Sequence, residues 1–276
     1  MFKKILIVIC CLFTLLGCSS NKNESKDRLA QIKEKGYIEF VTEPYWAPNE
    51  FIDPSLDGDS KYVGTDIELA KYIAEKIGVD LKIVPLDFTA VLTGITEAKY
   101  DMAISAIAWS PVRQEAMNLS DGYDFDDTGY GFLIREEDLG KYTCIEDLKD
   151  AIVITQSGSV QEAIYNEYCN NAKEFKLVTN MTDAYLAISE NKADVCITAI
   201  ASGQLYAEAN GNGLLCPDFK FDVDKKMTST CVALPLEGTD SLMEIVNECI
   251  KELTAADKFN EWTDYYEAYA KSLGIE

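Results

Sequence analysis

The sequence predicts an α/β protein built as two lobes. Short apolar runs alternate with segments of helical periodicity in two separate stretches, first over residues 37–106 and again over residues 151–209. Such alternation is typical of a parallel, doubly wound sheet that is flanked by helices. Because there are two sets and each has its own strands, we expect two sheets and therefore two lobes.

The first set follows a short helix over residues 27–35, which Gly36 ends. Thr65 and Glu68 have the spacing of a capping box, which predicts the start of the next helix, and Gly78 ends that helix. The apolar pattern places the strands of this set at 37–42, 79–85 and 101–106 and its helices at 65–77 and 89–99.

The second set lies between two further apolar runs, residues 129–135 and 230–235. We interpret these runs as strands that cross between the lobes, so that the chain builds the second lobe before it returns to complete the first. Lobe 1 then comprises residues 29–130 and 234–276, and lobe 2 comprises residues 136–229. The remaining strands are expected at 151–155, 175–178 and 194–198, and the remaining helices at 160–169, 182–190, 202–209, 240–254 and 256–270.

The first residues have the features of an export signal rather than of a folded element. Lys3 and Lys4 precede an apolar run that is too short to remain as a membrane span, and Leu15-Leu16-Gly17-Cys18 follows it. This order is typical of a lipoprotein signal peptide, residues 1–17, with Cys18 as the lipidated residue. We therefore expect residues 18–28 to be a tether and the protein to be anchored on the extracytoplasmic face of the cell membrane.

The formal net charge of −22 argues against a nucleic-acid partner. The chain has no histidine, and its cysteines beyond Cys18 are widely spaced, so we expect neither a metal site nor a cofactor, and mostly free thiols. Four aspartates before residue 129 lack the spacing of a calcium loop. We interpret them as a solvated loop, with a gate for cationic ligands as the alternative: Asp121, Asp124, Asp126 and Asp127.

The segment after the strand at 101–106 is the strongest candidate for a binding site. Ser110 and Pro111 form a helix-start signal, so free backbone amides lie just beyond the end of a buried strand. Ligands of open α/β sheets bind at such strand ends. Arg113 adds a planar fork of donors that suits a carboxylate. A surface salt bridge is the alternative role of an isolated arginine at this position.

The segments Ser105–Arg113 and Asn118–Tyr123 resemble the signature of the polar-amino-acid family of ABC-transporter solute-binding proteins. The resemblance extends from about Gly36 to Tyr269. It implies a two-lobe type II periplasmic-binding-protein fold in which the two crossing strands act as a hinge. It also implies a monomer that captures a small molecule without covalent chemistry and delivers it to an ABC permease in the membrane.

The resemblance assigns candidate ligand contacts to both lobes. Arg113 matches the arginine that pairs with the ligand carboxylate, and Ala199 stands where the family usually has an acid that binds the α-ammonium. Trp46 and Phe88 match cleft aromatics, although hinge packing and plain core packing are their respective alternatives. For Ser159 the alternative is a simple helix cap. The remaining contacts are Glu43, Ser105, Ala106, Ala108, Gly158 and Val160.

These assignments predict a lipoprotein that binds a small carboxylated solute, with an amino acid or a close derivative as the expected class. The missing acid at Ala199 leaves two readings, because either Glu43 alone holds the amine or the ligand has no standard α-amino group. Two other functions stay open. One is an enzyme on the same fold, such as a cyclohexadienyl dehydratase-like lyase with Glu43 as its acid, and the other is a ligand sensor for a partner receptor. We expect a binding protein rather than an enzyme.

Overall fold

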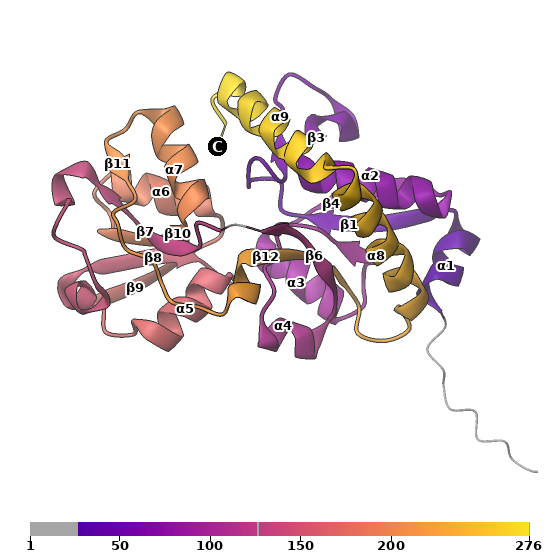
Figure 1. Ribbon diagram of the computed structural model, residues 1–276, viewed down its shortest axis with the longest axis horizontal. Helices are drawn as coiled ribbons and strands as arrows, with labels where there is room; N and C mark the ends of the chain where they lie inside the picture. Colours follow the sequence, from indigo (N-terminus) through magenta and orange to yellow (C-terminus); the bar gives the residue numbers. More distant parts are fainter. Residues whose placement is uncertain (1–26, 126, 276) are drawn as a thin grey trace, which may run out of the picture.

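The computed structural model describes residues 27–125 and 127–275, which form two lobes with one five-stranded sheet each (Figure 1). The sheet of lobe 1 has the order β4 (Asp80–Pro85), β1 (Tyr37–Thr42), β5 (Met102–Ala103), β12 (Ser229–Leu234) and β6 (Asn118–Phe125). The sheet of lobe 2 has the order β11 (Leu214–Leu215), β7 (Tyr130–Arg135), β10 (Val195–Ala199), β8 (Ile152–Gln156) and β9 (Glu174–Val178). The short pair β2 (Phe51–Ile52) and β3 (Tyr62–Val63) lies outside both sheets.

Helices cover both faces of each sheet, as the alternating sequence pattern predicts. The helices of lobe 1 are α1 (Arg28–Lys35), α2 (Thr65–Ile77), α3 (Phe88–Thr96), α4 (Pro111–Ala116), α8 (Asp240–Ala255) and α9 (Lys258–Leu273). The helices of lobe 2 are α5 (Val160–Tyr168), α6 (Met181–Ser189) and α7 (Ile200–Asn210). Short 3-10 turns occur at Gly58–Lys61, Glu136–Asp138, Ile145–Asp150 and Lys225–Thr228.

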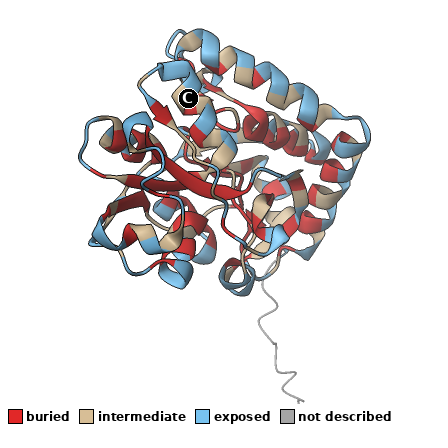
Figure 2. Ribbon diagram, turned by 60° about the vertical axis from the view of Figure 1, so that its left-hand side comes forward, coloured by how far each residue is buried: buried red, intermediate tan, exposed pale blue. Residues whose placement is uncertain are grey.

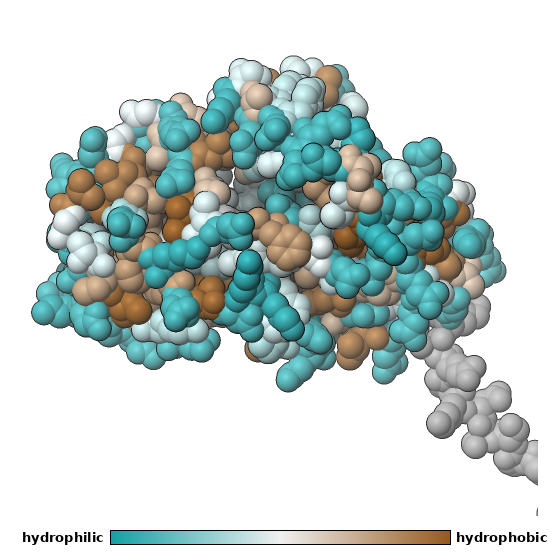
Figure 3. Space-filling model, viewed as in Figure 1, coloured by the Kyte–Doolittle hydropathy of each residue, from teal (hydrophilic) through white to brown (hydrophobic). Residues whose placement is uncertain are grey.

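Alternate side chains of one central strand fill two cores. In β1, Phe40 packs with α2 and α8 on one face, and its neighbour Val41 packs with α3 on the other. In β10, Val195 and Cys196 likewise point to opposite faces of the sheet and belong to different cores. Figure 2 shows the buried residues concentrated in the strands and on the inner sides of the helices, and the face seen in Figure 3 is mostly hydrophilic. Within the described ranges, no helix combines the length and apolar character needed to cross a bilayer.

The strands of the two alternating sets are parallel to one another, as the sequence predicted, but each sheet as a whole is mixed. One strand of each sheet runs against its neighbours: β7 is antiparallel to β10, and β12 is antiparallel to β5 and β6. The reason is the path of the chain, because β7 and β12 are the first strands after the chain passes from one lobe to the other. They start at the boundary between the lobes, whereas β1, β5, β8 and β10 end there.

The two apolar runs that we expected to cross between the lobes each lie within a single sheet. Tyr130 pairs with Ala199 in lobe 2, and Ser229 pairs with Phe125 in lobe 1. The passages between the lobes therefore lie just before β7 and just before β12. Strand β6 was not expected from the sequence, because most of its residues are polar or acidic and its buried positions, Ser120 and Tyr123, are three residues apart rather than two.

Two local expectations are wrong for the same reason, which is a contact distant in sequence. The predicted capping box does not form, because Gly64 precedes α2 and the amides of Thr65 and Asp66 donate to the carbonyls of the 48–49 loop at 3.2 and 2.9 Å. The predicted strand at 101–106 ends at Ala103. Beyond it, the Ala106 amide turns towards the Asp66 carboxylate and donates to it at 2.8 Å.

Gly64 lies at a close approach between the 48–49 loop and the start of α2, and a substitution there tests this part of the fold. Its φ is +129°, and an added Cβ would lie 2.1 Å from the carbonyl oxygen of Asn49. We expect Gly64→Ala to lower the free energy of unfolding by about 3 kcal/mol or more. Gly140→Ala is the matched control, because Gly140 also has a positive φ, +87°, but nothing within 4 Å. It should cost about 1 kcal/mol in a urea titration, and equal losses would contradict the close approach.

Candidate functional site: a cleft between the lobes

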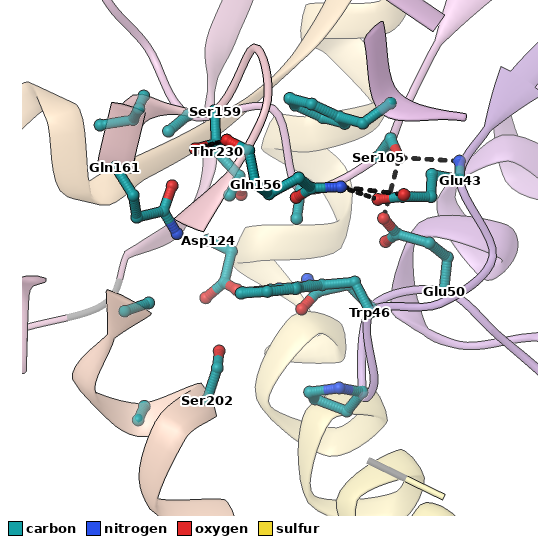
Figure 4. A pocket seen from close by; sticks show the side chains of 18 of the residues that line it. Glu43, Trp46, Glu50, Ser105, Asp124, Gln156, Ser159, Gln161, Ser202 and Thr230 are labelled. Carbon is teal, nitrogen blue, oxygen red and sulfur yellow. Dashed lines mark hydrogen bonds between the residues drawn. The ribbon is translucent and has the colours of Figure 1, made fainter. Parts of the chain in front are cut away.

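A cavity of about 230 Å³ lies between the lobes, at the edges where strands of both sheets end (Figure 4). Glu43 follows β1, and Ser105 follows β5. From the other lobe, Gln156 is the last residue of β8, and Ala199 is the last residue of β10. The cavity therefore lies where open α/β sheets bind their ligands.

The structure brings the candidate residues together. Gly158 lies beside the cavity wall, where its carbonyl accepts a hydrogen bond from Arg113. The proposed lipidation residue, Cys18, lies outside the described residues. The other ten candidates line the cavity, and their contacts with a ligand stay predictions: Glu43, Trp46, Phe88, Ser105, Ala106, Ala108, Arg113, Ser159, Val160 and Ala199.

Arg113 is buried and positively charged, and no carboxylate of the described residues pairs with it. Its side chain donates to the carbonyl of Ala108 at 2.6 Å and, across the cleft, to that of Gly158 at 3.0 Å. The residue is only 7% exposed, and burial lowers its pKa to about 10, so it remains charged at neutral pH. Within the described part of the chain, no carboxylate forms an ion pair with it, and the alternative of a surface salt bridge is therefore wrong.

The turn before α5 is more occupied than the sequence suggested. Ser159 caps the helix, because its hydroxyl accepts from the Glu162 amide at 3.1 Å and donates to the Gln156 carbonyl at 2.7 Å. The Gly158 amide donates to the Glu162 carboxylate at 2.6 Å. The amides that remain for an anion are those of the first helical residues, Val160 and Gln161, which have no acceptor within the helix and belong to the cavity wall.

A second polar contact also joins the two lobes. The side-chain nitrogen of Gln156 lies 2.9 and 2.7 Å from the two carboxylate oxygens of Glu43 (Figure 4). Glu43 is only 3% exposed, and burial raises its pKa to about 7. Together with the Arg113 to Gly158 hydrogen bond, this contact shows that the lobes are in a closed arrangement.

Trp46 and Glu50 are presented to the cavity by one tight loop. The backbone of Trp46 both donates to and accepts from that of Glu50, at 2.8 and 2.9 Å. The Trp46 indole points into the cavity, and its ring also packs against the core of lobe 2. Both the ligand role and the packing role of Trp46 thus have structural support.

Three acids of the cavity wall were not predicted as site residues. Asp124 belongs to the end of β6 and points into the cavity, so its interpretation as part of a solvated loop is wrong. Glu50 follows the aromatic loop, and Glu267 is on α9. No short motif links these residues to the Arg113 segment. Asp124 was named only in the alternative of a gate for cationic ligands. For Glu50 the signal was its position, seven residues after Glu43 in a loop that follows a strand.

Metal and thiol chemistry have little support at this site. Across the residues that the structure describes, no group of three or more His, Cys, Asp or Glu side chains is arranged to hold a metal ion. The six described cysteines are free thiols, and none of them lines the cavity. What the arrangement offers is one buried guanidinium, several carboxyl groups and an aromatic face, which suits the reversible binding of a charged small molecule.

Comparison with known proteins supports this interpretation. The chain is 25% identical over 255 residues to the arginine-binding extracellular protein ArtP of Bacillus subtilis, covering 90% of this chain and 91% of ArtP. It is 24% identical to a cyclohexadienyl dehydratase of Pseudomonas aeruginosa, with 82% of each chain covered. An amino acid ABC transporter substrate-binding protein of Streptococcus pneumoniae bound to L-arginine superimposes with a TM-score of 0.79 at 28% identity, covering 88% of this chain and 98% of that one.

ArtP and the pneumococcal protein are binding proteins, and the present chain is likewise a binding protein and not an enzyme. Its fold is the two-lobe type II fold that the resemblance implied. The family model of these proteins matches residues 38–269, which include every described candidate residue of the cleft. The chain belongs to the bacterial extracellular solute-binding proteins, family 3.

Proposed function

We propose that this protein captures an amino acid in the cleft between its lobes and delivers it to the membrane permease of an ABC importer. One observation carries the proposal: Arg113 is buried at the cavity wall with no carboxylate partner among the described residues. A buried charge is costly unless it is paired. The carboxylate of a ligand would supply that pair, because a guanidinium holds a carboxylate through two parallel hydrogen bonds.

The ligand's ammonium would bind on the lobe 1 side of the cavity. Ala199 ends β10 without a charged group, so lobe 2 has no acid at the position where the family usually holds the α-ammonium. Glu43 faces the same cavity from lobe 1 and can take that role. Of the two readings left open by the sequence, this one keeps a standard amino acid as the ligand, and the amino-acid-binding relatives support it.

Binding would proceed by closure of the lobes on the ligand. A solute held by Arg113 from lobe 1 and by the first amides of α5 from lobe 2 makes both sets of contacts only when the lobes are closed. A ligand that binds one state more tightly shifts the population towards that state. Closure of this kind gives a permease a way to distinguish the loaded protein from the free one.

The carboxylate contact can be tested from both sides of the interaction. We expect Arg113→Ala to weaken amino-acid binding by about 100-fold, since truncating one partner of a buried charge pair costs about 3 kcal/mol. Arg113→Lys should recover only part of the affinity, because it keeps the charge and loses the fork. The ligand-side control is an amino-acid amide, which lacks the carboxylate and should bind the unaltered protein poorly. Thermal-shift and calorimetric titrations with the L-amino acids measure these effects.

Unchanged binding by Arg113→Ala, or equal affinity for an amino acid and its amide, would refute the contact between Arg113 and the ligand carboxylate. Failure of every L-amino acid to shift the melting temperature of the unaltered protein would refute amino-acid capture as a whole.

The proposed anchor has its own test. If Cys18 carries the lipid, Cys18→Ala should move the protein from the membrane fraction to the soluble extracytoplasmic fraction, because the acyl chains that give lasting attachment would be absent. Immunoblots of fractionated cells measure the shift. Cys216→Ala is a control that changes a described cysteine away from the cavity and should leave the protein in the membrane fraction. A Cys18→Ala protein that stays fully membrane-bound would contradict lipidation at this residue.

A further inference from the structure

Three carboxyl groups are buried on the lobe 1 side of the cleft without a countercharge. Glu43, Glu50 and Asp66 are 3%, 1% and 0% exposed. Burial is the largest cause of a raised pKa for each of them, and it raises the pKa of Glu43 to about 7 and that of Glu50 well above its ordinary value. Buried acids either pair with a cation or keep a proton.

Hydrogen bonds connect these groups into one unit that reaches the cavity. The Ser105 hydroxyl accepts from the Glu43 amide at 2.9 Å and donates to Oε1 of Glu50 at 2.9 Å. Asp66 accepts from the Ala106 amide and from the Tyr123 hydroxyl, both at 2.8 Å. Oε2 of Glu50 is buried and accepts no hydrogen bond from the described residues, although Glu50 belongs to the cavity wall. The Glu50 carboxyl group is coupled to that of Asp66 by a side-chain hydrogen bond, which raises the pKa of Glu50.

No cationic side chain faces this unit from the elements packed around it. Asp87, after β4, raises the pKa of Glu43, and Asp124 of β6 raises that of Asp66. The remaining neighbours are neutral at pH 7: Gln156 from lobe 2, Ser105 and Tyr123. Hydrogen bonds lower the pKa of Glu43 and Asp66 in part, but a positive charge that would fully ionise the acids must come from outside the described residues.

The balance of charge around the cavity indicates what kind of ligand supplies it. Arg113 is the one cationic side chain of the described wall, against the four carboxyl groups of Glu43, Glu50, Asp124 and Glu267. The Trp46 indole adds a face that attracts cations. A zwitterion brings one charge of each sign and leaves the net negative charge of the wall unchanged, whereas an amino acid with a cationic side chain brings a second positive charge.

We propose that Glu43 and Glu50 form a shared seat for one of two cationic groups of the ligand, and that this seat gives up a proton when the cation binds. The ligand class is then an amino acid whose side chain carries an ammonium or guanidinium group. The proposal rests on the proposed function and narrows it. It also makes Glu50, whose carboxyl group accepts a hydrogen bond from Ser105 of the Arg113 segment, a specificity-determining residue.

The direction of the pH dependence follows from the proton balance. A bound cation lowers the pKa of the seat, so the free protein holds more protons than the complex at pH values below about 7. Affinity for the cationic ligand should therefore fall as the pH decreases from 8 to 5, by up to about tenfold per pH unit for each proton released. A neutral ligand that leaves the proton in place should show a much flatter profile.

Isothermal titration calorimetry with L-arginine and L-citrulline tests the proposal, since the two differ by the replacement of a guanidinium with a neutral urea group. We expect L-arginine to bind at least tenfold more tightly at pH 7. Its apparent binding enthalpy should differ between phosphate and Tris buffers in the sense of proton release, because the buffer takes up the proton. Glu50→Gln and Glu43→Gln should each reduce the release and the preference for L-arginine. Glu97→Gln, which removes an exposed acid paired with Lys99, should behave as the unaltered protein.

Two results would overturn the inference. One is equal affinity for L-arginine and L-citrulline, and the other is an arginine enthalpy that does not depend on the buffer. Both are measured on the unaltered protein, so they hold even if a seat variant fails to fold, which its melting curve without ligand would reveal. Amino-acid binding that still requires Arg113 would then leave the proposed function standing, whereas the absence of binding by any amino acid would remove both.

Discussion

A buried, unpaired guanidinium is the constraint around which the site is organised. Arg113 lies in helix α4 of lobe 1, yet one of its hydrogen bonds ends on the Gly158 carbonyl of lobe 2. Carbonyl oxygens stabilise the guanidinium only in part, because they carry no net charge. A negatively charged group of a ligand would therefore pair with Arg113 better than these carbonyl oxygens do. Arg113 also lies where both lobes can contact such a ligand.

Strand direction explains why both lobes meet at this point. The strands that carry site residues, such as β1, β5, β8 and β10, end at the boundary between the lobes, so the residues that follow them face one another. The chain can pass between two such sheets only by entering each one at the boundary. The antiparallel strands β7 and β12 are the consequence of that entry. The topology that links the lobes and the geometry that builds the cleft are thus one feature.

The sequence predicted those features that depend on residues close together in the chain, and it missed those that depend on residues far apart. Alternating apolar runs predicted most strands and helices because burial on both faces of a sheet leaves a pattern within a few residues, and the Arg113 segment carried its motif in one stretch. Glu50, Asp124 and Glu267 lie on three elements far apart in the chain and meet only in the folded cavity. The start of α2 was mispredicted likewise, since carbonyls of the 48–49 loop, rather than its own side chains, accept its first amides.

The distribution of charge assigns different tasks to the two lobes. Every charged side chain of the described cavity wall comes from lobe 1. Lobe 2 contributes only neutral residues, namely Tyr130, Gln156, Ser159, Val160, Gln161, Ala199, Ala201, Ser202, Leu205 and Thr228. Long-range attraction acts before the lobes close, whereas hydrogen bonds and apolar contacts require contact distance. In the proposed mechanism of closure, lobe 1 would therefore select a solute by its charge while the cleft is open, and lobe 2 would select by shape and by the hydrogen bonds that closure completes.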